Sequence, residues 1–128
     1  LSEFTAIENV LIPTWIGNHK ISKKDEAIDL FRKLNLISKV DSYPTDLSGG
    51  ERSRVALIRG IINKPKLLLA DEPTGNLDEK NASGLIKILK RINIDFNQSI
   101  ILTTHNPDVA KLGHNKYDLK NGVLKKTS

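Results

Sequence analysis

The fold of this chain is decided by residues 47–51, Leu-Ser-Gly-Gly-Glu, and by residues 67–73, Leu-Leu-Leu-Ala-Asp-Glu-Pro. In the first stretch Ser48 is a preferred helix N-cap, and Glu51 stands three residues later, which is the spacing of a capping box. The two glycines between them carry no side chain, so an anion can approach the bare N–H groups of a helix start. The stretch therefore predicts a helix over 49–62 whose N-terminus receives a phosphate.

The second stretch runs from apolar residues into two neighbouring carboxylates, Asp71 and Glu72. It predicts a buried parallel strand, because such strands are apolar on both faces and open α/β sheets bind ligands at the carboxyl ends of their strands. The apolar run 99–103 predicts a second buried strand, followed directly by His105. If the two strands are neighbours, we expect His105 to lie level with Asp71.

The rest of the chain divides into a helical part and a strand-and-helix part. Capping boxes at residues 5–8 and 22–25 predict two helices, of which the first is interrupted by Pro13 and Gly17. Asn121-Gly122 between short alternating runs predicts a hairpin near the end of the chain.

Composition excludes several classes of protein. The 128 residues suffice for one domain, and the lack of cysteine excludes disulfides and thiolate metal sites. No apolar run approaches the roughly 18 residues of a membrane-spanning helix, and no signal-peptide pattern is present. The net charge of +5 permits nucleic-acid or membrane-surface binding, but the lysines are scattered, so we expect a solvated surface.

The chain opens with Leu1 instead of Met, and we expect a truncated or processed product.

Three motifs in order, LSGGE at 47–51, LLLADEPTGNLD at 67–78 and TTH at 103–105, resemble the second half of an ABC-type ATPase. The resemblance implies an α/β fold of the P-loop NTPase type, with an incomplete sheet. Residues 1–62 would be an α-helical subdomain that ends in the signature helix. Residues 63–128 would be the distal part of the ATPase core, with its Walker B strand, D-loop and switch histidine.

The resemblance also implies roles for the acidic and histidine side chains. Asp71 would be the Walker B acid that holds Mg²⁺ through water. Glu72 would be the general base acting on the attacking water, and His105 would contact the γ-phosphate and position that water. The alternatives that the residues leave open are a capping or ion-paired Asp71, a surface Glu72 and a structural histidine.

Further roles concern a second subunit, because by resemblance two cassettes face each other head to tail around ATP. Residues that would bind the nucleotide held by the partner are Ser48, Gly49, Gly50 and Glu51. Residues of the D-loop that would cross the dimer interface are Asn76 and Asp78.

No G-x-x-x-x-G-K-[ST] occurs in the 128 residues, so this part of the family pattern is missing. The chain would therefore be the C-terminal portion of a cassette, and we expect it to be inactive alone. Two alternatives remain: a non-catalytic remnant that dimerises with an intact cassette, and a DNA-associated ABC ATPase.

Within the family, the chain resembles the ATP-binding subunits that serve lipoprotein release, macrolide export and cell division. The opening at 3–10 and the start of the signature helix look most like the lipoprotein-releasing subunits, although Ser53, Ile58 and Gly60 depart from the usual residues. The resemblance implies ATP and Mg²⁺ as cofactors and a homodimer at the cytoplasmic face of the inner membrane. Transmembrane permease subunits would dock near Trp15 and Ile16. No nucleic acid is expected as a partner.

Overall fold

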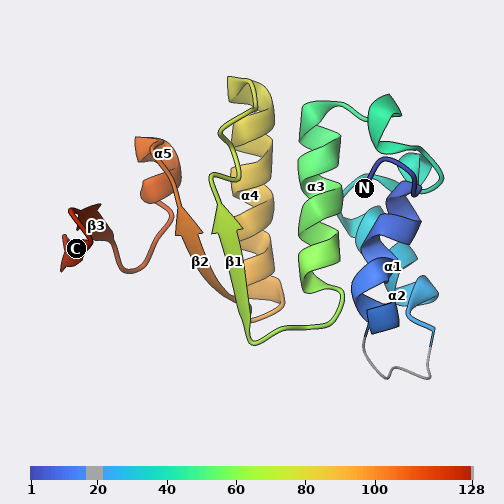
Figure 1. Cartoon of the computed structure of the whole chain (residues 1–128), viewed down its shortest axis with the longest axis horizontal. Helices are drawn as coiled ribbons and strands as arrows, with labels where there is room; N and C mark the ends of the chain where they lie inside the picture. Colours follow the sequence, from blue (N-terminus) through green and yellow to red (C-terminus); the bar gives the residue numbers. More distant parts are fainter. Residues whose placement is uncertain (17–21, 128) are drawn as a thin grey trace.

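The computed structural model describes residues 1–16 and 22–127 (Figure 1). The predicted loop over 18–21 and the stop at Gly17 lie outside the described residues. The helices are α1 (Ala6–Ile16), α2 (Lys24–Lys33), α3 (Gly49–Ile61), α4 (Glu79–Asp95) and α5 (Pro107–Ala110), with short 3₁₀ turns η1 (Ile37–Lys39) and η2 (Pro44–Asp46). The strands are β1 (Leu67–Asp71), β2 (Ser99–Thr103), β3 (Tyr117–Lys120) and β4 (Val123–Lys126).

Helix α1 begins at the predicted capping box but passes through Pro13. The Glu8 carboxylate accepts the Thr5 backbone N–H at 2.7 Å and the Thr5 hydroxyl at 2.8 Å. The predicted interruption at Pro13 is wrong, because α1 continues to Ile16. The carbonyl of Pro13 accepts the Asn63 amide at 3.0 Å, so contact with the chain beyond α3 supports this turn.

Helix α2 begins later than the sequence predicts. No capping box forms at residues 22–25: the N-cap is Lys23, which makes no side-chain cap bond, and the Ser22 hydroxyl accepts only the Lys24 N–H at 3.4 Å. The ammonium of Lys23 instead donates to the Ile62 carbonyl at 3.1 Å, so a contact with the end of α3 holds this start. Asn35, in the left-handed region at φ 56°, follows the end of α2.

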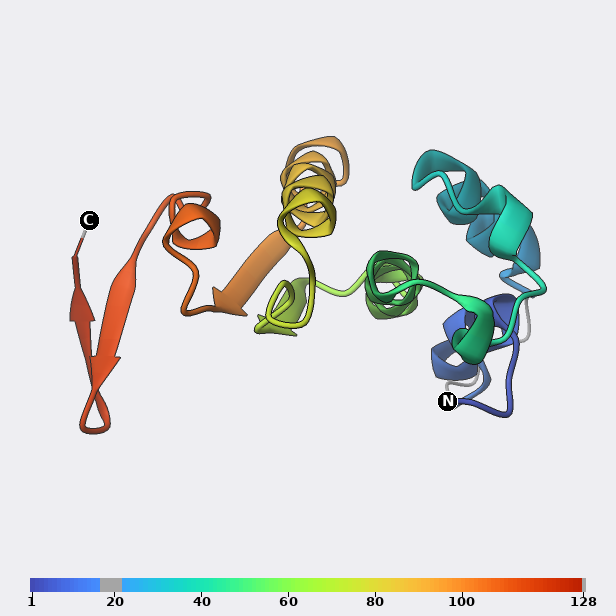
Figure 2. The ribbon, with the colours of Figure 1, turned by 90° about the horizontal axis from the view of Figure 1, so that it is seen from above.

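Helix α3 stands between two layers. Figures 1 and 2 show α1 and α2 on one side of it and β1 with α4 on the other. The largest fully buried side chains come mainly from the helices and from the segments that follow them: Val10, Phe31, Leu36, Ile58, Ile62, Ile92 and Val109. The core therefore lies between the helices and extends to the α4 side of the sheet.

Strands β1 and β2 are parallel neighbours in a register that pairs Leu67 with Ser99 and Asp71 with Thr103, which confirms the predicted α/β class. The prediction that both strands are buried is wrong. Leu69 is 70% exposed and Ile101 is 56% exposed, whereas Leu68 is 8% exposed. The reason is that α4 packs on one face of the pair, while the described residues leave the other face open (Figure 2). We call this the open face; its side chains are Leu67, Leu69, Asp71, Ser99, Ile101 and Thr103.

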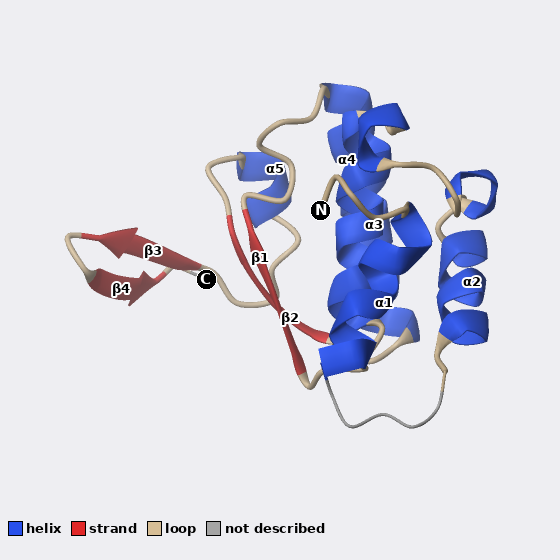
Figure 3. Ribbon diagram, turned by 45° about the vertical axis from the view of Figure 1, so that its right-hand side comes forward, coloured by secondary structure: helices blue, strands red, loops and turns tan. Residues whose placement is uncertain are grey.

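The predicted hairpin is formed by β3 and β4, which pair antiparallel. Asn121 at φ 51° and Gly122 at φ 75° supply the two positive φ angles that a tight hairpin turn requires. Figure 3 shows the hairpin apart from β1 and β2, so the sheet is incomplete, as expected. None of the helices in residues 1–16 and 22–127 has both the length and the apolarity to cross a bilayer.

Candidate functional site

The start of α3 is held by the predicted capping box. The Ser48 hydroxyl accepts the Glu51 N–H at 3.2 Å, and the Glu51 carboxylate accepts the Ser48 N–H at 2.8 Å. This bond to the Ser48 backbone is the main reason why the pKa of Glu51 is lowered. Lys39 lies 3.8 Å from the other carboxylate oxygen of Glu51. The carboxylate of Glu51 is therefore engaged within its own chain, and Ser48 stays exposed.

The carboxyl ends of β1 and β2 are joined by side chains. The hydroxyl of Thr103 donates to Oδ1 of Asp71, its partner in the strand register. The prediction that His105 lies level with Asp71 is wrong by two residues, because β2 ends at Thr103. Thr103 is not among the site residues predicted from the sequence. No local pattern marks Thr103 as the partner of Asp71, because the pairing depends on the register of the two strands.

Glu72 turns the chain out of β1 with a left-handed φ of 43°, which is uncommon for a residue with a side chain. Its N–H donates to the Thr103 carbonyl at 3.0 Å, and its carbonyl accepts the Gly75 N–H at 3.0 Å. Oε1 of Glu72 lies 3.4 Å from Nε2 of His105. The side chain of Glu72 is 35% exposed and that of His105 is fully exposed, so both are open to a ligand from solvent.

The loop after Glu72 leads into a second cap. Thr74 is buried, and its carbonyl accepts the Leu77 N–H at 3.1 Å. Asp78 caps α4: one carboxylate oxygen accepts the Asn81 backbone N–H and the other accepts the Asn81 side-chain amide, both at 2.8 Å. These bonds lower the pKa of Asp78, with the backbone bond contributing most. Asn76 is exposed at the tip of the same loop.

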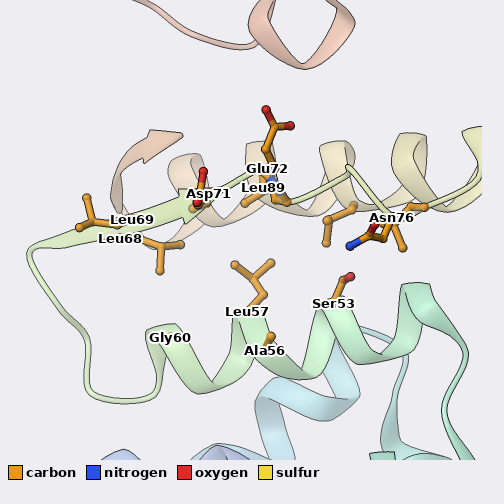
Figure 4. A pocket seen from close by; sticks show the side chains of 14 residues that line it. Ser53, Ala56, Leu57, Gly60, Leu68, Leu69, Asp71, Glu72, Asn76 and Leu89 are labelled. Carbon is orange, nitrogen blue, oxygen red and sulfur yellow. The ribbon is translucent and has the colours of Figure 1, made fainter. Parts of the chain in front are cut away.

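A cleft of about 340 Å³ lies between α3 on one side and β1 and α4 on the other (Figure 4). Its apolar lining includes Leu57 of α3, Leu68 of β1 and Leu89 of α4. In Figure 4 the carboxylates of Asp71 and Glu72 point away from α3. Asp71 and Glu72 border the cleft, but their carboxylates are directed away from its α3 wall.

The predicted site residues form two groups. Asp71, Glu72 and His105 gather at the carboxyl ends of β1 and β2. The signature glycines sit instead against the loop and cap before α4: a Cβ on Gly49 would lie 3.4 Å from Leu77.

The Asp71 carboxylate fits a magnesium ion held mainly by water and by nucleotide phosphates. Within residues 1–16 and 22–127, no three His, Cys, Asp or Glu side chains cluster as metal ligands. One oxygen of Asp71 accepts the Thr103 hydroxyl, and the other is left for a water. A single carboxylate suits that water-mediated arrangement and would not build a complete metal site by itself.

The chain belongs to the ABC transporter family, whose family model matches residues 1–75. Within this family it is similar to lipoprotein-releasing system ATP-binding proteins named LolD. The protein from Buchnera aphidicola is 47% identical over 112 residues, which cover 85% of this chain and 48% of the relative. The protein from Blochmanniella floridana is 42% identical, over 98% of this chain and 54% of the relative. The chain thus spans about half the length of these relatives, and the LolD-like resemblance is confirmed.

Solved structures agree with the fold. The dimeric structure of MJ0796, a bacterial ABC transporter cassette, has a TM-score of 0.83 at 31% identity. It is matched over 98% of this chain and 56% of that chain. A dimeric post-hydrolysis state of the same cassette, bound to ADP and phosphate, has a TM-score of 0.81 at 29% identity. The predicted P-loop NTPase-type fold, in partial form, is therefore confirmed.

Proposed function

We propose that this chain is part of the ATP-hydrolysing subunit of an ABC transporter. In this proposal the chain supplies Asp71 and Glu72 to one nucleotide site, and it supplies the signature residues at the start of α3 to a second nucleotide site. The observation that carries the proposal is the 3.4 Å contact between Glu72 and His105, beside Asp71, at the carboxyl ends of two parallel strands. Ligands of open α/β sheets bind at this edge.

The chemistry follows from the accessible groups. The Glu72 carboxylate takes the proton of a water as that water attacks the γ-phosphorus of ATP, and the bond from phosphorus to the ADP oxygen breaks. His105, beside this carboxylate, contacts the γ-phosphate and keeps the water in line. Asp71, oriented by Thr103, would hold magnesium through a water. The ion, when bound, neutralises charge on the phosphates.

A second subunit completes the proposed site. Ser48, Gly49 and Gly50 present the N-terminus of α3, where backbone N–H groups favour an anion, to the γ-phosphate of ATP held by the partner. Asn76 and Asp78 lie at the loop beside them and would cross the same interface. The dimeric state of the similar cassette MJ0796, seen in two structures, supports a homodimer.

We propose lipoprotein release at the cytoplasmic face of the inner membrane as the process served, on the basis of the names of the LolD relatives. Permease subunits would dock on the end of α1, where Trp15 is 57% and Ile16 is 83% exposed. Residues 1–62 would form the helical subdomain and residues 63–128 the distal core.

The test is a completed cassette, made by joining this chain to the complementary part of the Buchnera relative. We expect the completed cassette to hydrolyse ATP and the 128-residue chain alone to show no turnover. Glu72→Gln should lower kcat by roughly 100-fold or more, because the general base is lost, and should preserve ATP-dependent dimerisation. The matched control is Glu79→Gln, which changes an exposed glutamate at the start of α4 and should leave kcat unchanged.

A folded completed cassette that dimerises with ATP but hydrolyses it equally well with Glu72→Gln would contradict the hydrolytic role. A folded one that never turns over ATP would favour the non-catalytic interaction module. Salt-dependent DNA binding would favour the DNA-associated alternative.

A further inference from the structure

The starts of α3 and α4 touch through a glycine and an asparagine that are far apart in sequence. Gly50 is buried against the side chain of Asn81: a Cβ added to Gly50 would lie 2.5 Å from Oδ1 and 2.8 Å from Cγ of that amide. Real Cβ atoms essentially never come so close. Gly50 is therefore needed for space, because its backbone lies directly on the Asn81 amide.

The Asn81 amide is itself held in one orientation. Its Nδ2 donates to Oδ2 of Asp78 at 2.8 Å, and its backbone N–H donates to Oδ1 of Asp78 at 2.8 Å. With the nitrogen of the amide turned to Asp78, the oxygen is left facing Gly50. One side chain thus joins the N-cap of α4 to the first turn of α3.

Beyond this contact, a cleft lies between the bodies of the two helices. The cleft between them is lined by Ser53 and Leu57 of α3 and by Leu85 and Leu89 of α4. The helix bodies therefore leave space where the helix starts are in contact. At the helix starts the close approach is that of Gly50 to Asn81.

We propose that Asn81 is a positioning residue that fixes the signature turn of α3 to the Asp78 cap of α4. The two segments then reach a second cassette as one rigid surface. The coupling between Gly50 and Asn81 stands on the contacts above, and its role in dimerisation rests on the proposed function. Asn81 itself need not touch the nucleotide.

The coupling is tested in the 128-residue chain by a double-mutant cycle on the thermal midpoint. Gly50→Ala should lower Tm by roughly 3–6 °C, because the new methyl group meets the Asn81 amide. An Asn81→Ala background removes Oδ1 and Cγ, the two atoms within 3.0 Å, and keeps only the Cβ at 3.2 Å. In this background Gly50→Ala should leave Tm unchanged or raise it, since alanine favours a helix. If Asn81→Ala does not fold, Asp78→Ser provides a second background, because serine still caps α4 but cannot accept the Asn81 backbone N–H and side-chain amide together, so the amide is free to move away from Gly50.

The matched control is Gly84→Ala in the body of α4, where a new Cβ would meet nothing within 4 Å. This change should not lower Tm in any background. If Gly50→Ala lowers Tm equally in the parent chain and in the Asn81→Ala background, the coupling is overturned.

The positioning role is tested in the completed cassette carrying Glu72→Gln. Asn81→Ala should raise the ATP concentration for half-maximal dimerisation about tenfold, because the interface segments are no longer held together. Affinity of the monomer for a fluorescent ATP analogue should not change. If Asn81 has only a structural role, Asn81→Ala will lower Tm but will leave the ATP concentration for half-maximal dimerisation unchanged when it is measured well below Tm. That result would overturn the positioning role. If the cassette with Asn81 intact fails to dimerise with ATP, the proposed function fails, and the double-mutant cycle still decides the coupling.

Discussion

Ser48 contributes to stability through a reciprocal pair of hydrogen bonds with Glu51. We expect Ser48→Ala to lower the free energy of unfolding by about 1 kcal/mol, because the Glu51 N–H loses its acceptor. Urea denaturation measures this loss. The control is Ser83→Ala, the same chemical change at an exposed position in the body of α4, which should stay within about 0.5 kcal/mol of the parent. Equal effects at both positions would contradict the cap.

Low pH should destabilise the chain, because it protonates the carboxylates of Glu51 and Asp78 at the starts of α3 and α4. The folded pKa of Glu51 lies below its ordinary 4.5 and that of Asp78 below its ordinary 3.8, because both carboxylates accept N–H bonds. Their contribution is fully present above these ordinary values and is lost as pH falls through the lower folded pKa values. The urea midpoint should hold near neutrality and fall below about pH 4.5. The double variant Glu51→Gln, Asp78→Asn should show a smaller acid loss; an identical acid loss would speak against the caps as its source.

Thr103 orients the carboxylate that we assign to magnesium. In the completed cassette, Thr103→Val should lower kcat about tenfold, since a hydrogen bond to a charged group contributes about 1.5–3 kcal/mol. Thr103→Ser keeps the hydroxyl and should restore most of the rate. Steady-state ATP hydrolysis over a range of Mg²⁺ concentrations measures the effect, which should include a weaker response to Mg²⁺. A valine variant with unchanged kinetics would contradict this role.

At the scale of elements, β1 is covered on one face only. Leu68 is 8% exposed and packs toward Gly60, where a Cβ would lie 2.9 Å from its side chain, whereas Leu69 is 70% exposed. We expect Leu68→Ala to lower the free energy of unfolding by about 3 kcal/mol. Leu69→Ala should change it by less than about 0.5 kcal/mol. Chemical denaturation measures both variants, and each serves as the control for the other. Equal losses in the free energy of unfolding would mean that both faces of β1 are buried.

The elements themselves were largely predictable from local signals. The capping boxes at Thr5 and Ser48, the cap at Asp78 and the turn at Asn121-Gly122 all form because their bonds lie within a few residues. The passage of α1 through Pro13 and the start of α2 were not predictable from local signals. Both places make hydrogen bonds to residues distant in sequence: Asn63 donates to the Pro13 carbonyl, and Lys23 donates to the Ile62 carbonyl.

The candidate site was predictable in its residues and less so in its arrangement. An apolar run that ends in two carboxylates marks Asp71 and Glu72, but only the strand register pairs Asp71 with Thr103. The contact of Asn81 with Gly50 joins residues that are separated by most of α3, by β1 and by a loop, so it leaves no pattern in the sequence. The exposure of Leu69 was missed because an apolar run does not tell whether both faces of a strand are covered.

At the scale of the whole molecule, the open edges of the two-stranded sheets and exposed apolar side chains predict self-association. The open face carries Leu67, Leu69 and Ile101, and the hairpin adds Leu119 and Leu124, all at least 44% exposed. Sedimentation velocity over a wide range of protein concentration should show growing assemblies of the 128-residue chain.

A double variant, Leu69→Lys with Ile101→Lys, should shift the population toward monomer because it charges the open face. The control is Ile94→Lys, which changes an isoleucine that is 75% exposed on α4 and should leave the assemblies in place. A strictly monomeric chain at every concentration would contradict the prediction.

The open face also governs how strongly the acidic site interacts with a charged ligand. Asp71 and Thr103 share this face with Leu69 and Ile101, so water reaches all four side chains. In the dielectric of bulk water, about 80, two unit charges 4 Å apart interact by about 1 kcal/mol; at an effective value of about 20 they interact by about 4 kcal/mol. Any surface that covers Leu67 and Leu69 also excludes water from the carboxylate of Asp71. The same hydrophobic contact that completes the fold would therefore raise the electrostatic strength of the site, without moving any of its atoms.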